Sequence, residues 1–372
     1  MTPSVYVIAG GGTSGHVNPA LAIAEAIRAN EPDARIEFVG TRRGIENRLI
    51  HQAGYPFHEI RASGLPSRLS PAMFRAIRDY LAGRRQCLKL LKALRPNAVI
   101  GTGGYVCSPL VAAAARLNIP VLLHEQNAYP GRSNRMMARR SQAVCLSFAD
   151  AIPYFPEKTP LYLTGNPVRS VFFEQSHEKA RVEASLTPDD RFVLALGGSL
   201  GAQSINQAIL NLDTVISSLP EQHPLRRLRV ILGCGAQHET AVRQAAAGYD
   251  WLEVHAYIDQ IQQLMAAADL IICRAGAGAC FELAALGRPA ILVPYPHAAG
   301  DHQTANAASL VHAGAAVLCR DQDLTAERLM EYFNDLLTDP TKLKTMAEAA
   351  SSLARPDAAA EIYQYLRQIR SD

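Results

Sequence analysis

The 372-residue sequence lacks a C-x-x-C cysteine pair, a strong net charge and a basic segment before its first apolar run. Its seven cysteines are an odd number, so we expect neither a disulfide framework nor a zinc ribbon, but buried reduced thiols as in a cytosolic protein. The net charge of +3 is too small to indicate nucleic-acid binding. The missing basic segment argues against a signal peptide. The length allows two domains, each with its own core.

Charge is absent from one long stretch, residues 96–115, which could be mistaken for a membrane span. Three glycines interrupt it, and Ser108 and Pro109 are typical of a helix start, with Ser108 as the cap of a helix over 110–115. We therefore interpret the stretch as a buried strand, a loop and a helix. The sequence predicts no transmembrane segment.

The amino terminus contains an apolar run, residues 5–9, that leads directly into the glycine-rich GGGTSGH of residues 10–16. Glycines let a backbone approach an anion closely, and free N–H groups at a helix start favour negative charge. A helix is predicted next, with Asn18 as its cap and Pro19 in its first turn. The pattern is typical of phosphate binding.

The spacing Gly10-x-Gly12-x-x-Gly15 also fits a dinucleotide-binding fingerprint. Such a site needs an acidic residue at the end of the second strand. The second predicted strand, 35–39, ends without one, and we expect the neighbours of Glu37 in mid-strand to hold it away from a ligand. The dinucleotide interpretation is weakened accordingly.

Apolar segments alternate with helical ones along the whole chain, which predicts an α/β fold with parallel sheets. After the first strand, we predict strands at 35–39, 57–60, 97–101, 119–123, 143–147 and 161–164, then at 192–196, 229–232, 251–255, 270–273, 290–293 and 315–318. Turn residues at 164–167 separate the two series. We expect two Rossmann-like domains facing a central cleft, 1–165 and 166–349. A last helix, about 358–370 within a carboxy-terminal segment of about 350–372, carries an apolar stripe that either domain could cover; we expect it to pack on the first.

Two further glycine-rich turns follow predicted strands, GTGGYVCSP at 101–109 and GGSLGA at 197–202. One such turn is structural about as often as functional, whereas three together favour phosphate binding. The polar segment His124–Glu125–Gln126–Asn127 follows the strand at 121–123, where we expect a position on the cleft rim, with a simple turn as the alternative.

In the second half, residues 272–279 end a strand with small side chains that would let a ligand lie against the backbone. Glu282, expected in the first turn of the next helix, could accept hydrogen bonds from a diol such as ribose. A favourable interaction with the helix dipole is its alternative role.

Two patterns suggest a metal ion only superficially. Asp321-Gln322-Asp323 resembles the Asp-x-Asp pair of metal-dependent sugar transferases, but we expect it to cap the following helix. His297 and His302 lack helical spacing and a third ligand. The sequence predicts no metal site and no cofactor.

Eight segments together resemble one family. They are GGGTSGH, GTGGYVCSP, HEQN, GNPVR (165–169), GGSLGAQSIN (197–206), YID (257–259), CRAGA (273–277) and DHQTANA (301–307). They are similar, in register from about residue 4 to 320, to the MurG family of bacterial peptidoglycan glycosyltransferases. The resemblance implies a GT-B fold and inverting transfer of N-acetylglucosamine from UDP-GlcNAc to lipid I, the undecaprenyl-diphosphate-linked muramyl pentapeptide, giving lipid II.

The resemblance also implies site residues. Donor contacts are expected at Thr13, Ser14, Gly15, Asn127, Arg169, Ser199, Ile258, Ala277, Gly278, Ala279, Cys280, Phe281, Glu282 and Gln303. Among these, Ile258 would meet the uracil, Glu282 the ribose, Ser199 a phosphate and Gln303 the sugar hydroxyls, while Arg169 would stabilise departing UDP. Acceptor contacts are expected at Gly103, Gly104, Tyr105 and His124.

For the general base the first candidate is His16, whose side chain titrates near neutral pH. Its rival role is donation to the lipid diphosphate. Glu125 is the second candidate, and His124 could orient it.

A lipid acceptor predicts a membrane contact. Nine basic residues and one acid lie between Arg61 and Arg95. The expected surface comprises Met73, Phe74, Arg75, Ile77, Arg78, Tyr80, Leu81, Arg84 and Arg85. Such a mixture suits an anionic leaflet, although a helix with an apolar core face is the alternative. The implied location is peripheral, on the cytoplasmic face of the cell membrane, with other cell-wall synthesis proteins as further partners and no nucleic acid.

Two other functions remain open. A UDP-GlcNAc 2-epimerase of the same fold would lack the basic apolar surface and would need extra carboxylates in its cleft. A non-catalytic scaffold would be expected to have lost the glycines or Glu282.

Overall fold

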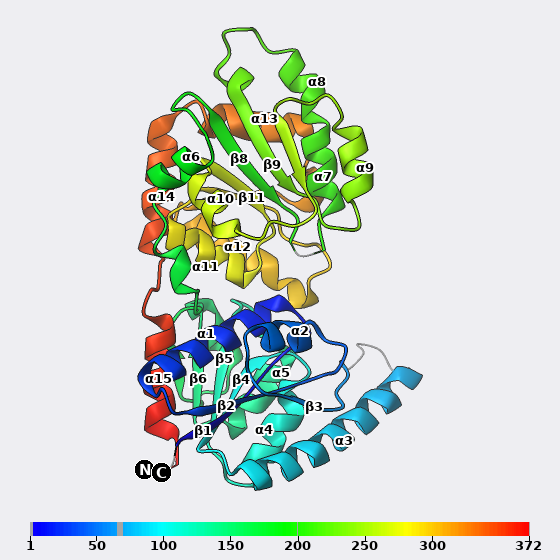
Figure 1. Cartoon of the computed structure of the whole chain (residues 1–372), viewed down its shortest axis with the longest axis vertical. Coiled ribbons are helices and arrows are strands. Elements are labelled where there is room, and N and C mark those ends of the chain that lie inside the picture. Colours follow the sequence, from blue (N-terminus) through cyan, green and yellow to red (C-terminus); the bar gives the residue numbers. More distant parts are fainter. Residues whose placement is uncertain (1–2, 65–69, 199, 372) are drawn as a thin grey trace. The chain divides into compact units, whose positions relative to one another are not determined.

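The computed structural model describes residues 3–64, 70–198 and 200–371, and the chain divides into two compact units (Figure 1). Unit 1 runs to Val168 and resumes at Arg355, so that it contains both ends of the chain. Unit 2 spans Arg169–Ala354.

Unit 1 is built on a seven-stranded sheet in the order β3-β2-β1-β4-β5-β6-β7, in which every pair is parallel. Its strands are β1 (Val5–Gly10), β2 (Arg35–Gly40), β3 (Phe57–Glu59), β4 (Ala98–Gly103), β5 (Val121–Glu125), β6 (Ala143–Leu146) and β7 (Leu161–Leu163). Tyr6 and Ile8 of β1 face one apolar cluster, while Val7 and Ala9 face the other. This alternation explains why both sides of the strand read as apolar: helices cover both faces of the sheet.

One face of this sheet packs on α1 (Ser14–Asn30), α2 (Ile45–Gln52) and α15 (Ala358–Ile369). The other packs on α3 (Pro71–Leu94), α4 (Cys107–Arg116) and α5 (Arg132–Met137). The carboxy-terminal stripe covers unit 1, because Ile362 and Leu366 are fully buried against the first of these faces. Arg370 binds Glu31 and the Tyr6 hydroxyl, which fixes the end of α15.

Two predicted helix starts are wrong. The cap of α1 is Thr13 in extended conformation, five residues before the predicted Asn18, and Pro19 lies inside the helix. The helix tolerates this proline because the carbonyl that loses its bond belongs to exposed Gly15. Likewise, α4 begins at Cys107 rather than after a Ser108 cap.

Unit 2 repeats the architecture with a six-stranded parallel sheet in the order β10-β9-β8-β11-β12-β13. Its strands are β8 (Arg191–Leu196), β9 (Leu228–Gly233), β10 (Leu252–His255), β11 (Leu270–Cys273), β12 (Ala290–Leu292) and β13 (Ala316–Leu318). Its helices are α6 (His177–Glu183), α7 (Gln203–Leu210), α8 (Leu212–Ser217), α9 (Glu239–Ala245), α10 (Ile261–Ala267), α11 (Ala277–Leu286), α12 (His302–His312), α13 (Ala326–Leu336) and α14 (Pro340–Ser352). The predicted α/β class with two Rossmann-like sheets is confirmed.

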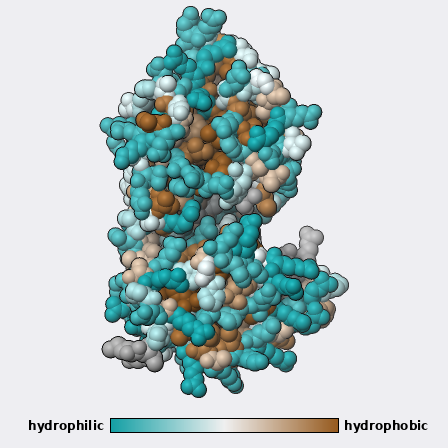
Figure 2. Space-filling model, viewed as in Figure 1, coloured by the Kyte–Doolittle hydropathy of each residue, from teal (hydrophilic) through white to brown (hydrophobic). Residues whose placement is uncertain are grey.

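The cysteines are all free and buried, as expected, and burial raises the pKa of several of these thiols, that of Cys107 to about 12. Among the described residues, no helix has the length and apolarity required to cross a membrane. Hydrophilic residues cover most of the face shown in Figure 2, where apolar residues gather in separate patches. Glu37 is buried in β2, as expected, with its carboxylate 2.7 Å from His58 Nε2.

Candidate active site

The glycine turns after β1 and β4 meet where the strand order of unit 1 reverses, which is where open α/β sheets bind ligands. Both turns need glycine. Gly104 has φ +82°, and a Cβ there would lie 2.1 Å from the carbonyl oxygen of Gly11. Gly103 has φ +112°, and its Cβ would lie 2.7 Å from Nδ1 of His16. The two turns therefore interlock, and any side chain at these positions would displace the first loop.

A buried carboxylate fixes the first loop from the other side. Oε2 of Glu46 accepts a hydrogen bond from the Gly12 amide at 3.2 Å, and Oε1 accepts from the Thr41 amide and hydroxyl at 3.0 and 2.7 Å. Glu46 is fully buried, so the carboxylate depends on these donors. It ties the loop after β1 to the loop after β2.

Three successive amides at the start of α1 remain available. Thr13 caps α1, a helix of 17 residues that begins with Ser14 and Gly15, and within the described ranges the N–H groups of these three residues meet no acceptor. An exposed helix start with free amides favours a phosphate group. The sequence prediction of an anion site here is compatible with this geometry.

A chain of hydrogen bonds leads from His16 to the buried end of β5. Nδ1 of His16 lies 3.0 Å from Oε1 of Gln126, and Nε2 of Gln126 lies 2.9 Å from Nδ1 of His124. Nε2 of His124 lies 3.1 Å from the Gly165 carbonyl. Burial lowers the pKa of His124 to about 4, so this ring is neutral at pH 7.

The directions of these bonds follow from the one group that cannot donate, the Gly165 carbonyl. His124 donates to it through Nε2, so its Nδ1 accepts from the Gln126 amide nitrogen. The Gln126 oxygen then faces His16, which must donate through Nδ1. In the neutral His16 ring, Nε2 therefore carries the lone pair that can accept a proton.

The structure corrects the expectations for the segment 124–127. His124, Glu125 and Gln126 are buried rather than placed on a rim, since β5 continues through Glu125. His124 contacts Gln126 and not the Glu125 carboxylate, so it does not orient Glu125.

Glu125 instead holds the loop that follows it. Its Oε1 accepts from the amide and the side chain of Asn127, and its Oε2 accepts from the Gly131 amide and the Asn134 side chain, at 2.9 to 3.2 Å. Both oxygens are thus engaged by donors, and the carboxylate is 1% exposed. This arrangement suits a structural anchor better than a proton acceptor.

Unit 2 has an equivalent reversal between β8 and β11. Gly201 has φ +78°, and a Cβ there would lie 2.1 Å from the Cys234 carbonyl oxygen, which explains the glycine. The neighbouring Ser199, an expected phosphate contact, lies outside the described residues. Across the reversal, α11 begins at Ala277 after the extended Gly276, and a Cβ on Gly276 or Gly278 would meet open space. Small residues thus leave this helix start accessible.

Glu282 is the sixth residue of α11 and not in its first turn as expected, because the helix begins at Ala277. Its alternative role at the helix dipole is weakened by this position. Burial raises the pKa of its carboxyl, and the positive charge of Arg169 opposes that shift. Arg169 is exposed and precedes a short 3-10 turn, Ser170–Phe172, that contacts α11. Arg169 is thus near enough for its charge to act on the Glu282 carboxyl.

The remaining donor candidates also surround the reversal in unit 2. Ile258 follows β10, and its Cδ1 would lie 3.5 Å from a Cβ on Gly233 at the end of β9. Gln303 lies in the first turn of α12, where its Oε1 accepts from the Tyr295 amide at 2.9 Å. This bond fixes the Gln303 amide near the loop after β12.

We expected the Asp-x-Asp pattern to cap the next helix, and this expectation is wrong. Thr325 is the cap of α13, with its side chain accepting from the Arg328 amide. Asp321 binds Arg274 and the Ser204 hydroxyl, and Asp323 pairs with Arg320 at 2.6 Å. These contacts tie the ends of β11 and β13 to α7. Among the described residues, no group of three or more His, Cys, Asp or Glu side chains is arranged to hold a metal ion.

The basic apolar segment forms α3, whose first turns project from unit 1 in Figure 1. Phe74 is 79% exposed, and Ile77 and Leu81 are each nearly half exposed. Arg75, Arg78 and Arg85 are exposed beside them, whereas Met73, Tyr80 and Arg84 are half-buried. The core face of the helix uses other residues: Ala76, Gly83, Cys87 and Leu91. The apolar residues of the expected membrane surface are therefore not simply core.

Sequence analysis alone assigned no role to three residues that hold the parts of each candidate site together in the structure. Gln126 was quoted within HEQN without a role, and Glu46 and Arg274 received none. An acidic residue at the start of the helix after a GTRRG turn was the available signal for Glu46. Nothing in the sequence indicated that Gln126 contacts His16, because the two residues are far apart along the chain.

Comparisons with known proteins agree with this geometry. Residues 6–146 match the glycosyltransferase family 28 N-terminal domain, and residues 192–362 match the C-terminal domain of the same family. The fold and its two glycine-lined reversals are thus those of a GT-B glycosyltransferase.

Relatives that align over nearly the full length identify the family within this class of glycosyltransferases. The chain is 42% identical to the UDP-N-acetylglucosamine–N-acetylmuramyl-(pentapeptide) pyrophosphoryl-undecaprenol N-acetylglucosamine transferase of Desulforudis audaxviator, covering 98% of both chains. It is 38% identical to the enzyme of that name from Acetivibrio thermocellus, covering 98% of this chain and 97% of the other. The crystal structure of Acinetobacter baumannii MurG superposes with a TM-score of 0.76 at 31% identity, covering 98% of this chain and 100% of that one. The chain belongs to the MurG family.

A UDP-GlcNAc 2-epimerase from Neisseria meningitidis also superposes, with a TM-score of 0.67 at 13% identity, over 99% of this chain and 100% of that one. At this identity the likeness concerns the fold alone.

Proposed function

We propose that this chain transfers N-acetylglucosamine from UDP-GlcNAc to the muramyl 4-hydroxyl of lipid I, forming lipid II and UDP. The observation that carries the proposal is the full-length similarity to transferases of that name, joined to a site in which His16 keeps Nε2 available beside two interlocked glycine turns. His16 is the general base in this reaction.

The reaction is a single displacement with inversion. The 4-hydroxyl oxygen of the muramyl sugar forms a bond to the anomeric carbon while the bond from that carbon to the UDP oxygen breaks, and the hydroxyl proton passes to Nε2 of His16. Gln126 and His124 keep His16 in the tautomer that can accept it. A positioned base of this kind contributes about 10²–10⁴-fold to a rate.

Donor binding falls to unit 2 in this proposal. Ile258 contacts the uracil, Glu282 accepts from the ribose hydroxyls, and Gln303 contacts the sugar. The amides at the start of α11 and the guanidinium of Arg169 stabilise the charge that develops on departing UDP. Ser199 remains a proposed phosphate contact. The first-loop residues Thr13, Ser14 and Gly15 and the loop residue Asn127 are proposed to join the donor site from unit 1.

Acceptor binding falls to unit 1, with Gly103, Gly104 and Tyr105 beside the muramyl diphosphate. His124 acts through Gln126 rather than by touching the acceptor, because it is fully buried. The exposed residues of α3 rest on an anionic membrane surface on its cytoplasmic face, where each added cation contributes about 1 kcal/mol.

The decisive experiment is incubation of the purified protein with labelled UDP-GlcNAc and a short-chain lipid I analogue. We expect a labelled disaccharide lipid. Release of free N-acetylmannosamine with UDP would instead identify an epimerase, and absence of any turnover under conditions in which a relative is active would identify a scaffold.

The membrane contact has a separate test. Co-sedimentation with vesicles containing anionic lipid should fall at least fivefold when Phe74 and Ile77 are both changed to serine, since both side chains are exposed. Unchanged sedimentation would place the membrane contact elsewhere.

A further inference from the structure

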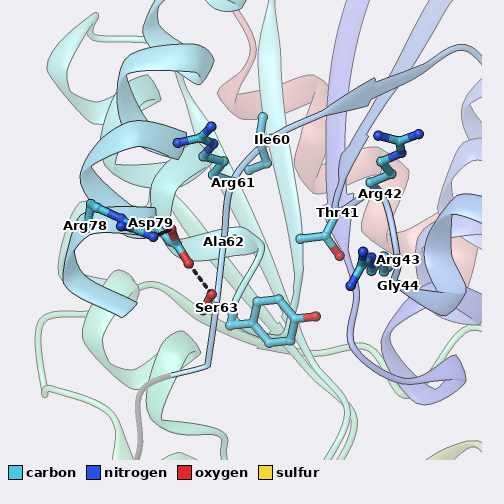
Figure 3. A pocket seen from close by; sticks show the side chains of 11 residues that line it. Thr41, Arg42, Arg43, Gly44, Ile60, Arg61, Ala62, Ser63, Arg78 and Asp79 are labelled. Atoms are coloured by element: carbon cyan, nitrogen blue, oxygen red, sulfur yellow. Dashed lines mark hydrogen bonds and ion pairs between the residues drawn. The ribbon is translucent and has the colours of Figure 1, made fainter. Parts of the chain in front are cut away.

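A basic pocket of about 1040 Å³ opens in unit 1 beside the first glycine loop (Figure 3). Its lining comes from the loop after β2, the segment after β3, α3 and the turn after β4: Thr41, Arg42, Arg43, Gly44, Ile60, Arg61, Ala62, Ser63, Arg78, Asp79 and Tyr105. Neither the expected donor contacts nor the expected base lies in it. The volume is at the upper end of ordinary ligand pockets.

One wall is fixed firmly on α3. The Arg61 amide donates to Oε1 of Gln86 at 2.9 Å, and a Cβ on Gly83 would lie 2.0 Å from the Arg61 carbonyl oxygen. The Ser63 hydroxyl donates to Asp79 at 2.6 Å, the bond drawn in Figure 3. Gly83 thus permits the close approach that holds the segment after β3 against the helix.

The opposite wall shares its anchor with the candidate active site. Glu46 binds Thr41 of the pocket and Gly12 of the first glycine loop through the same carboxylate. Tyr105 connects them again, because its Cε1 would lie 3.1 Å from a Cβ on Gly12. The pocket is therefore built against the loop that carries His16.

The charge of the pocket is strongly unbalanced. Arg42, Arg43 and Arg61 have no carboxylate within 4 Å among the described residues. Arg78 pairs only with Asp79, at a long 3.6 Å, and Asp79 is already bound to Ser63. Four arginines from three stretches of chain, with one carboxylate among the lining residues, favour an anionic ligand with more than one acidic group.

We propose that this basic pocket binds the carboxylates of the peptide carried by the acceptor. This inference rests on the proposed function. Muramic acid carries its peptide on a lactyl group at the carbon next to the one bearing the reacting 4-hydroxyl. With that hydroxyl at His16, the peptide would begin near the first glycine loop, against which the pocket is built. A pentapeptide ends in a carboxylate, and a guanidinium fork binds a carboxylate through two parallel hydrogen bonds. The acceptor diphosphate has its own proposed place beside Gly103 and Gly104, which are not part of the pocket lining.

The test compares two acceptors on two enzymes. The acceptors are a short-chain lipid I analogue with the full pentapeptide and the same analogue with the peptide replaced by an uncharged alanine amide. For Arg43→Gln together with Arg61→Gln, we expect the KM for the pentapeptide acceptor to rise about tenfold or more, because charge-assisted bonds are lost. The KM for the alanine-amide acceptor and for UDP-GlcNAc should stay within twofold.

The matched control is Arg48→Gln, an exposed arginine of α2 outside the pocket lining, which should leave all three KM values unchanged. An equal rise for both acceptors would assign the pocket to the diphosphate or to a lipid headgroup and overturn the proposal. Unchanged KM values in the double variant would overturn it as well.

A binding measurement separates this proposal from the proposed function. Fluorescence anisotropy with a labelled, lipid-free muramyl pentapeptide should show binding to the wild type and about tenfold weaker binding to the double variant. If the wild type turned over neither acceptor, the transferase proposal would fail, while the anisotropy result would still decide whether the pocket binds the peptide.

Discussion

Nδ1 of His16 donates to Oε1 of Gln126 across 3.0 Å, and Gln126 is itself oriented by the buried ring of His124. Nδ1 of His16 therefore already carries a proton in the neutral ring, and Nε2 is the nitrogen that can accept one. In the proposed reaction, the substrate hydroxyl contacts His16 at Nε2. In the proposed mechanism the role of Gln126 is positioning, and the first prediction below separates this role from a merely structural one.

Changing Gln126 to glutamate should move the pH profile of the reaction. A carboxylate beside Nδ1 stabilises the protonated His16 ring and raises its pKa, so the acid limb of the kcat/KM profile should shift to higher pH. Steady-state rates between pH 5.5 and 9 would measure the shift. The variant Gln126→Met, which keeps the size but not the amide, should lower kcat about 10- to 100-fold with little change in KM. A profile that stays in place in the glutamate variant would remove Gln126 from the mechanism.

The variant Glu125→Gln tests whether Glu125 is a structural anchor of its loop or the general base. Four N–H groups converge on the Glu125 carboxylate, so an amide must turn its own NH₂ toward two of them. We expect a loss of about 1–3 kcal/mol in stability, seen as a lower melting temperature, with kcat within about tenfold of wild type. The opposite pattern, with unchanged melting and a kcat reduced a thousandfold, would make Glu125 the base.

His124 should make unit 1 sensitive to acid. Its pKa in the folded protein, about 4, lies below the ordinary histidine pKa of 6.5, because burial disfavours the charged ring. Between these values the unfolded chain binds more protons, so stability falls as the pH drops from about 6.5 to 4, by up to about 3 kcal/mol. Melting temperatures by circular dichroism across this range should fall less steeply for His124→Gln, each protein being compared with its own value at pH 7. Parallel slopes would contradict the assignment.

The variant Asp321→Asn tests the contacts of Asp321 with Arg274 and Ser204 in unit 2. Removing the charge leaves Arg274 without its carboxylate, although two backbone carbonyls still accept from it. Because the pair is only partly buried, we expect a loss of about 1–3 kcal/mol, less than for a fully buried pair. The chain has one tryptophan, Trp251 in unit 2, so its fluorescence in urea reports on this unit directly. The exposed pair partner Asp323, changed to asparagine, is the control and should cost less than about 1 kcal/mol.

The sheets were predictable because the strands are buried on both faces. Runs such as 5–9 and 270–273 are apolar throughout, and glycines or polar residues end them, so their type and approximate ends followed from local pattern alone. The helix starts were harder. Asn18 and Pro19 look like an N-terminus, yet α1 begins earlier because the interlocked glycine turns place Thr13 in extended conformation.

The roles of the polar residues depended on contacts that sequence does not encode locally. For HEQN, the expected rim position and the expected contact between His124 and Glu125 were wrong, because the partners of these two side chains come from 165 and from the loop 127–134. The basic pocket was also hidden. Its arginines come from separate segments, and only the packing at Gly83 and the anchor at Glu46 bring them around one space.

The place of α15 has a consequence for how this chain is made. Ile362 and Leu366 complete an apolar layer whose other members, such as Tyr6 and Phe38, are translated long before them. Unit 2 is translated entirely in between. Part of one side of the nascent sheet of unit 1 therefore stays uncovered until α15 has been made. A truncation that removed α15 would leave that part of the sheet exposed in every molecule and prone to aggregation.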